Sequence, residues 1–247
     1  MQLYVMELYR RFKECGSVSV GLQTLRKGDM FFDLTEGCSS AVDALAAGAS
    51  CVVVSSASGA AVQGDAGYFQ VDDVLTALHD LARWHRSMSF VGGRPIPVIA
   101  LAGESGLADV KEEIVGALSG RLEVVATPGE ADDLRTLPLT LLRITPSTKV
   151  VVVAFASGRQ GDVAKMSNVA LPNYGLVTSA SACTGELYSY LRRTSDRVFL
   201  NVDDPLLCSM ASECGLHHDP ERADSLVIPY NDGQAASAIA EAISSML

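Results

Sequence analysis

The alternation of apolar strands and helices after Pro97 is the feature that most constrains the fold. Residues 98–102 (VIALA) and 150–155 (VVVVAF) are uninterrupted apolar runs of strand length, and a helical segment follows each of them. Strands that are apolar on both faces are typical of a parallel sheet with helices on both sides. We therefore predict an α/β fold, with a mostly parallel, doubly wound sheet in residues 95–247.

A smaller α/β domain is predicted before it, over residues 1–88. Residues 30–32, 51–54 and 68–71 resemble short strands. The segment after Asp72, a predicted N-cap, has apolar residues at spacings of three and four, as an amphipathic helix does. Residues 87–97 (SMSFVGGRPIP) are rich in glycine and proline, so we expect them to form the linker between the two domains.

Composition excludes several classes of partner. The chain is 48% hydrophobic and has a formal net charge of -10, which argues against nucleic acids and anionic membranes as partners because both attract cationic surfaces. No run approaches the roughly 20 apolar residues that cross a bilayer. Glu7 and Arg10 interrupt the N-terminal segment, which is therefore not expected to be a signal peptide. We predict a cytoplasmic protein.

The six cysteines form no C-x-x-C pair, so we expect reduced thiols. Cys208, Cys214, His217 and His218 could share a metal ion, but their spacing matches no metal-binding pattern. We predict no metal site.

The turn after residues 98–102 is the first place to seek a ligand, because the ligands of doubly wound sheets bind beyond the carboxyl ends of the strands. A phosphate-binding loop needs glycines, a lysine for the phosphates and a hydroxyl for Mg²⁺. Gly103 and Gly106 are present, but Leu107 and Ala108 stand at the lysine and hydroxyl positions. Gly103 and Gly106 are either an anion cradle or a tight turn without its ligand, and we favour the second interpretation.

Several segments, in the same order, resemble the Mur ligase family, in particular the ligases that add D-alanyl-D-alanine in peptidoglycan synthesis. The matching segments are residues 24–32 (TLRKGDMFF), 71–84 (VDDVLTALHDLARW), 97–106 (PVIALAGESG), 127–146, 159–163 (RQGDV), 170–178 (ALPNYGLVT), 185–191 (GELYSYL) and 201–207 (NVDDPLL). The resemblance implies a UDP-substrate-type N-terminal domain and a P-loop-like, ATPase-type central domain. It also implies an ATP- and Mg²⁺-dependent amide ligase.

The chain departs from that family at the positions that carry its chemistry. Leu107 replaces the phosphate-loop lysine, Ala108 the Mg²⁺-binding hydroxyl, and Ala154 the Mg²⁺-binding glutamate. In the first domain, Gly21 and Gln23 lie where the family's uridine-contacting pattern is expected.

Other family positions are altered or ambiguous. Residues 130–136 replace the family's asparagine-rich stretch, and residues 179–181 replace its N-I-x-x-x-H segment. Residues 226–236 faintly resemble the opening of the family's C-terminal domain, which we expect to be missing or reduced to a remnant. Lys111 keeps a family position, and we expect it to be solvated on its helix face.

Asn201, Asp203 and Asp204 match a nucleotide-side turn of the family. They either form a vestigial nucleotide site or simply make a turn and a helix cap, and the sequence leaves both readings open.

The sequence therefore predicts a Mur ligase homologue with no catalytic residues and no cofactor, a pseudoenzyme that acts through a protein partner or a second copy of itself. Two alternatives remain. One is a divergent, active D-alanyl-D-alanine-adding ligase that uses ATP and Mg²⁺. The other is a module that binds a nucleotide or nucleotide sugar without turnover.

Overall fold

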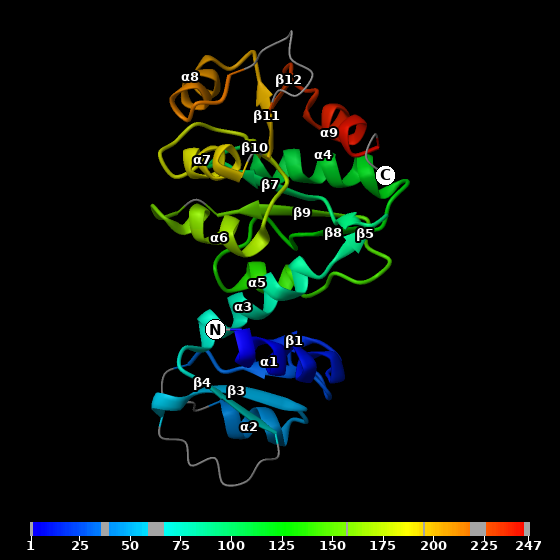
Figure 1. Ribbon diagram of the computed structural model, residues 1–247, viewed down its shortest axis with the longest axis vertical. Helices are drawn as coiled ribbons and strands as arrows, with labels where there is room; N and C mark the ends of the chain where they lie inside the picture. The colour runs from blue at the N-terminus through cyan, green and yellow to red at the C-terminus, as the bar shows by residue number, and fades with distance from the viewer. Residues whose placement is uncertain are drawn as a thin grey trace. The chain divides into compact units, whose positions relative to one another are not determined.

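The computed structural model describes residues 2–35, 40–58, 67–156, 158–194, 196–217 and 226–244. The chain divides into two compact units, Met1–Arg86 and Ser87–Leu247, each with a parallel sheet of its own (Figure 1). Within the described residues, no helix is long and apolar enough to cross a membrane.

The first unit is built on a four-stranded parallel sheet in the order β1-β2-β3-β4. Its strands are β1 (Val18–Ser19), β2 (Met30–Phe32), β3 (Cys51–Ser55) and β4 (Tyr68–Val71). Its helices are α1 (Gln2–Glu14), α2 (Ala41–Ala46), the short 3-10 helix η2 (Ser56–Ser58) and α3 (Val74–Ser87). These bounds confirm the three segments predicted as strands, residues 30–32, 51–54 and 68–71. Phe31, Val52 and Ala44 lie in the core of this unit.

Helix α3 begins one residue later than predicted. The carboxylate of Asp73, not of Asp72, accepts the backbone amide of Thr76 at 2.6 Å, which is the bond that an N-cap makes to the third helical residue. The predicted apolar face is buried, and His85 on that face packs against the rings of Tyr9 and Phe12.

The second unit contains a six-stranded sheet in the order β12-β11-β10-β7-β9-β8, in which every neighbouring pair is parallel. Its strands are β7 (Val98–Ala102), β8 (Val124–Ala126), β9 (Val150–Phe155), β10 (Tyr174–Val177), β11 (Arg197–Asn201) and β12 (Val227–Tyr230). The predicted parallel α/β sheet is confirmed. Its central strands β7, β9 and β10 are fully buried, as their apolar sequences require.

Helices cover both faces of this sheet. α4 (Leu107–Ser119) and α9 (Ala235–Ser244) pack together on one face, where Ile114 and Ile239 join the core. α6 (Asp162–Ala170) and α7 (Gly185–Thr194) lie on the other side in Figure 1. Two further helices are α5 (Thr136–Leu141) and α8 (Pro205–Glu213).

The segment predicted as a linker has regular structure. β5 (Phe90–Val91) and β6 (Arg94–Pro95) form an antiparallel hairpin whose turn is Gly92-Gly93. Both glycines have positive φ, 57° and 79°, which is the backbone that a two-residue hairpin turn requires. The glycines mark a turn within a hairpin, and the boundary between the units falls just before it, at Arg86 and Ser87.

Candidate functional site

The loop between β7 and α4 has the shape of a phosphate-binding turn. Gly106 precedes α4 in the left-handed conformation at φ 68°, which glycine adopts at little cost. Gly103 lies so close to the neighbouring strand end that a Cβ atom there would overlap the hydroxyl of Thr178. Both glycines are therefore required by the turn itself, whether or not a ligand binds.

Two backbone amides of this loop already have a partner within the chain. The hydroxyl oxygen of Ser179 accepts the amide of Glu104 at 2.7 Å and that of Ser105 at 3.3 Å. The neighbouring Thr178 hydroxyl donates to the carbonyl of Ser105 at 2.7 Å. Backbone amides of such a loop would hold an anion. Here the side chain of Ser179, which follows β10, accepts hydrogen bonds from two of them.

The start of α4 supplies no positive charge. Leu107 is 9% exposed and belongs to the apolar core, and Ala108 is half-buried. Glu104 and Asp109, both exposed, are the charged residues of the loop and the first helical turn. The charged side chains of this loop therefore repel polyphosphate.

Ala154, at the predicted Mg²⁺ position near the end of β9, is fully buried and adjoins a buried polar network. Its amide donates to the Thr127 hydroxyl at 3.0 Å, and that hydroxyl donates to the Asp132 carboxylate at 2.6 Å. Thr140 donates to the other oxygen of Asp132 at 3.2 Å. Burial raises the pKa of the Asp132 carboxyl, against the lowering effect of these hydroxyl donors.

Lys111 is not solvated, so that prediction is wrong. Its side chain is 2% exposed, and its ammonium donates to the carbonyls of Thr127, at 3.3 Å, and Gly129. Glu112 pairs with it at 3.1 Å. The apolar stem of the side chain lies in the core, and the ammonium at its end binds the two carbonyls. Lys111 therefore links α4 to the loop after β8.

The turn of Asn201, Asp203 and Asp204 is engaged within the chain. Asp204 caps α8 by accepting the amides of Leu206 and Leu207, at 2.8 and 3.1 Å. The Asp203 carboxylate accepts the Asn231 side-chain amide and the Asp232 backbone amide, and the Asn201 amide donates to Asp232 at 2.6 Å.

For Asp204 the structure shows the helix cap, one of the two readings that the sequence left open. Asn201 and Asp203 tie β11 to the loop after β12. A nucleotide would have to compete with those bonds.

Gly21 and Gln23 lie in the first unit, after β1. The Ser19 hydroxyl donates to the Gly21 carbonyl at 2.9 Å and contacts the Thr24 hydroxyl at 2.8 Å, while Gln23 is exposed. These bonds form a closed local turn.

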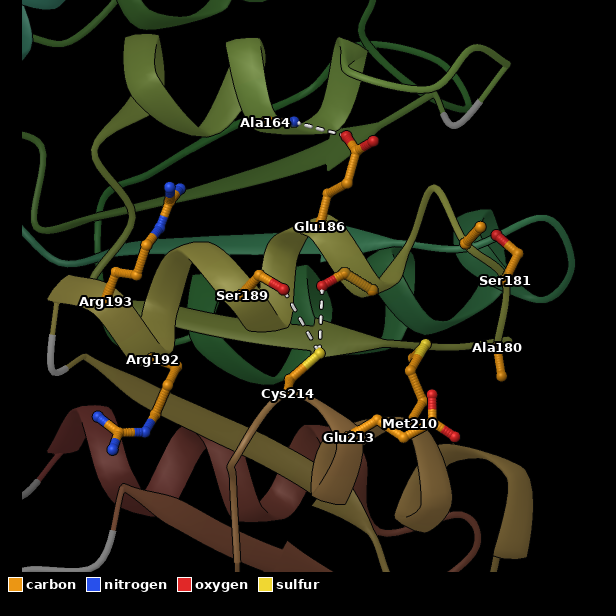
Figure 2. A pocket seen from close by; sticks show the side chains of 12 residues that line it. Ala164, Ala180, Ser181, Glu186, Ser189, Arg192, Arg193, Met210, Glu213 and Cys214 are labelled. Atoms are coloured by element: carbon orange, nitrogen blue, oxygen red, sulfur yellow. Dashed lines mark hydrogen bonds between the residues drawn. The ribbon is translucent and has the colours of Figure 1, made fainter.

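A shallow groove of about 920 Å³, which sequence reasoning missed, lies between α6, α7 and α8. Figure 2 shows the carboxylate of Glu186 turned toward α6, where it accepts the amides of Gly161 and Ala164 at 2.6 and 3.0 Å. Arg192 and Arg193 line the same groove together with Glu213. Its residues come from three separate helices, so no sequence motif marks it.

The thiols show no metal-binding arrangement among the described residues, in which no group of three or more His, Cys, Asp or Glu side chains could hold an ion. Cys214 contacts the Ser189 hydroxyl at 3.5 Å and the Gly185 carbonyl at 3.7 Å (Figure 2). Five cysteines are free thiols. Cys38 and His218 lie outside the described residues.

Sequence reasoning identified the loop but not its internal partner. Ser179 was noted only as part of a segment that differs from the family. The order of the strands contains the missing signal: β10 lies beside β7, so the residues after Val177 must meet those after Ala102.

Comparisons of the sequence and of the structure with known proteins point to the same family. No protein-family model matches the chain. UDP-N-acetylmuramoyl-tripeptide--D-alanyl-D-alanine ligase of Mycobacterium leprae is 30% identical over 230 residues, covering 79% of this chain and 44% of the relative. The ligase of the same name from Mycobacterium tuberculosis is 29% identical over 228 residues, with the same coverage.

Solved structures show the same fold. MurF from Acinetobacter baumannii superposes with a TM-score of 0.74 at 16% identity, over 93% of this chain and 53% of that one. MurF ligase from Thermotoga maritima, solved in complex with ADP, gives 0.67 at 20% identity over 86% and 50%. The chain is thus a homologue of the UDP-N-acetylmuramoyl-tripeptide--D-alanyl-D-alanine ligases of the Mur ligase family, and it spans about half the length of those relatives.

Proposed function

We propose that this chain is a pseudoenzyme, a Mur ligase homologue that has lost ATP binding and ligase activity and that acts through association with a protein. The observation that carries the proposal is the bond between the Ser179 hydroxyl and the amides of Glu104 and Ser105. In a phosphate-binding loop those amides would face the nucleotide.

Binding a triphosphate in this loop would have two costs. The Ser179 bonds would have to break, and a typical intramolecular hydrogen bond contributes about 1 kcal/mol. The phosphates would also approach Glu104 and Asp109, and like charges 4 Å apart repel by about 1 kcal/mol in water and about 4 kcal/mol at an effective dielectric constant of 20. With Leu107 in the lysine position, no cationic side chain of the loop offsets that repulsion.

The divergent-ligase alternative would need another carboxylate for Mg²⁺ beside Ala154. Asp132 is the carboxylate that adjoins it, since the Asp132 amide donates to the Ala154 carbonyl at 2.7 Å. Both carboxylate oxygens of Asp132 are held by threonine hydroxyls, and the residue is 1% exposed. Mg²⁺ keeps several waters and needs open oxygen ligands, so this buried carboxylate is a poor substitute.

The nucleotide-module alternative rests on Asn201 and Asp203. Their side chains bind Asp232 and Asn231, which leaves them little capacity for a base or a ribose. This arrangement favours a structural role for the turn.

Association is supported by what remains after these losses. The sheet and its core are retained. Apolar side chains are exposed at and just before the start of α8, where Leu206 is 71% exposed and Val202 38%. Sedimentation velocity over a range of concentrations would reveal self-association. A monomer at all concentrations would exclude self-association.

Activity can be tested directly. The chain is incubated with ATP, Mg²⁺, UDP-muramoyl tripeptide and D-alanyl-D-alanine, with a full-length relative as the positive control and heat-denatured chain as the negative control. We expect no product above the negative control. Product formed by the unmodified chain would overturn the proposal in favour of the divergent ligase.

A further inference from the structure

A second pocket lies at the amino ends of the strands of the six-stranded sheet, whereas the Gly103–Gly106 loop follows the carboxyl end of β7. It has a volume of about 540 Å³, and Pro97, Leu122 and Lys149 contribute to its lining. These residues precede β7, β8 and β9, respectively. Because the strands are parallel, the pocket lies at their amino ends, and the β5–β6 hairpin supplies its remaining wall through Val91, Gly92, Arg94 and Pro95.

The charged residues that line this pocket are all cationic. They are Arg94, Arg121 and Lys149, and no carboxylate of the described residues lines it. Within the described part of the chain none of the three makes an ion pair. Glu123 is the nearest acidic residue in the sequence, and its backbone carbonyl accepts the backbone amide of Lys149, but it does not line the pocket.

This concentration of positive charge is unusual for the chain as a whole, whose net charge is -10. The groove between α6, α7 and α8 offers a comparison, because Glu186 and Glu213 accompany its two arginines. Three cations line one concavity without a carboxylate among its described lining residues, and they create a local positive potential that attracts anions.

The pocket also has the size and walls of a small-molecule site. Ligand pockets commonly measure about 300–1,000 Å³ and combine apolar walls with a few polar anchors. Val91, Pro95 and Leu122 supply apolar surface beside the cations. Arginine binds phosphate oxygens in a bidentate fashion, and lysine binds them as a point charge.

We propose that this pocket binds a small phosphorylated organic molecule, with Arg94, Arg121 and Lys149 holding its phosphate and the hairpin and Leu122 contacting its apolar part. This site is distinct from the Gly103–Gly106 loop, and the proposal does not depend on whether that loop binds ATP.

The test is isothermal titration of the intact chain with inorganic pyrophosphate, ribose 5-phosphate and uncharged ribose, at low salt. We expect saturable binding of ribose 5-phosphate and no binding of ribose. Tighter binding of ribose 5-phosphate than of pyrophosphate supports a contribution from the apolar walls. Pyrophosphate binding without ribose 5-phosphate binding would contradict the organic part of the proposal.

Substitutions then assign the site. Removing one cation in Arg121→Gln or Lys149→Gln should weaken ribose 5-phosphate binding at least about five-fold, the effect of one charge at 4 Å in water. The matched control, Arg193→Gln, removes the same charge from the other groove and should leave binding unchanged. The proposal would be overturned if Arg121→Gln and Lys149→Gln bound ribose 5-phosphate as tightly as the Arg193→Gln control does. It would also be overturned if the original chain showed no saturable binding up to about 10 mM. Because the substituted side chains are partly or fully exposed, the variants are expected to fold.

Discussion

The hydroxyl oxygen of Ser179 lies 2.7 Å from the backbone nitrogen of Glu104 and accepts its hydrogen. The two residues are far apart in sequence and meet because β10 and β7 are neighbours in the sheet. This bond lies in a loop that contains Gly103 and Gly106 and no lysine.

Ser179→Ala should remove that bond and expose two amides. Because the loop is exposed to water, which can replace the hydroxyl, we expect the free energy of unfolding to fall by only about 0.5–1 kcal/mol. Chemical denaturation measures it. Ser189→Ala, an exposed serine of α7, is the control and should have a smaller effect. No difference between the two variants would contradict the role given to Ser179.

Gly103→Ala should destabilise the chain strongly. The new Cβ would overlap the Thr178 hydroxyl, which the Ser105 carbonyl holds in place, and overpacking of this kind costs about 1–3 kcal/mol.

Gly116→Ala is the matched control for that substitution, because Gly116 lies inside α4 with open space around it. It should raise the free energy of unfolding by about 0.5–1 kcal/mol, since alanine favours a helix over glycine. Thermal or urea unfolding should therefore give opposite signs for the two variants. The same sign for both would show that the tight approach at Gly103 is not a constraint.

Lys111→Met should show whether the buried lysine fastens α4 to the loop after β8. It keeps the apolar stem but leaves the carbonyls of Thr127 and Gly129 without their donor. We expect a loss of about 1.5–3 kcal/mol in the free energy of unfolding, the range for hydrogen bonds to charged groups. Lys165→Met, at a lysine 66% exposed, should stay within about 0.5 kcal/mol of the original chain. Similar small effects for both would restore the solvated reading of Lys111.

Asp132 should make stability fall as the pH rises. Burial raises the pKa of its carboxyl in the folded chain above the ordinary value of 3.8. The folded state then holds its proton more tightly than the unfolded state. The stabilisation is fully present below pH 3.8 and is lost as the pH rises through the folded pKa.

The comparison for Asp132 is with Asp132→Asn, which cannot titrate. The stability of the original chain minus that of the variant should decline from pH 3.8 upward. An increase in the difference with pH would contradict the burial argument.

The fold was largely predictable, and the site only in part. Apolar runs such as 150–155 specified the central strands because a strand buried on both faces leaves no choice of residue type. The amphipathic helix α1 was missed because its charged residues, including Arg10 with its Glu7 and Glu14 partners, obscure an apolar stripe that contains the buried Leu8. The roles of Ser179 and Lys111 depend on contacts between distant segments, which residue spacing does not encode.

The most direct test of the account is calorimetric titration of the chain with ATP and Mg²⁺. We expect no saturable binding up to about 1 mM nucleotide, because Ser179 occupies the amides of Glu104 and Ser105. Leu107 and Ala154 also stand where we expect a nucleotide site to need a lysine and a Mg²⁺ ligand. A dissociation constant in the range of about 1–10 μM, equivalent to about 7–8 kcal/mol of binding free energy, would contradict it.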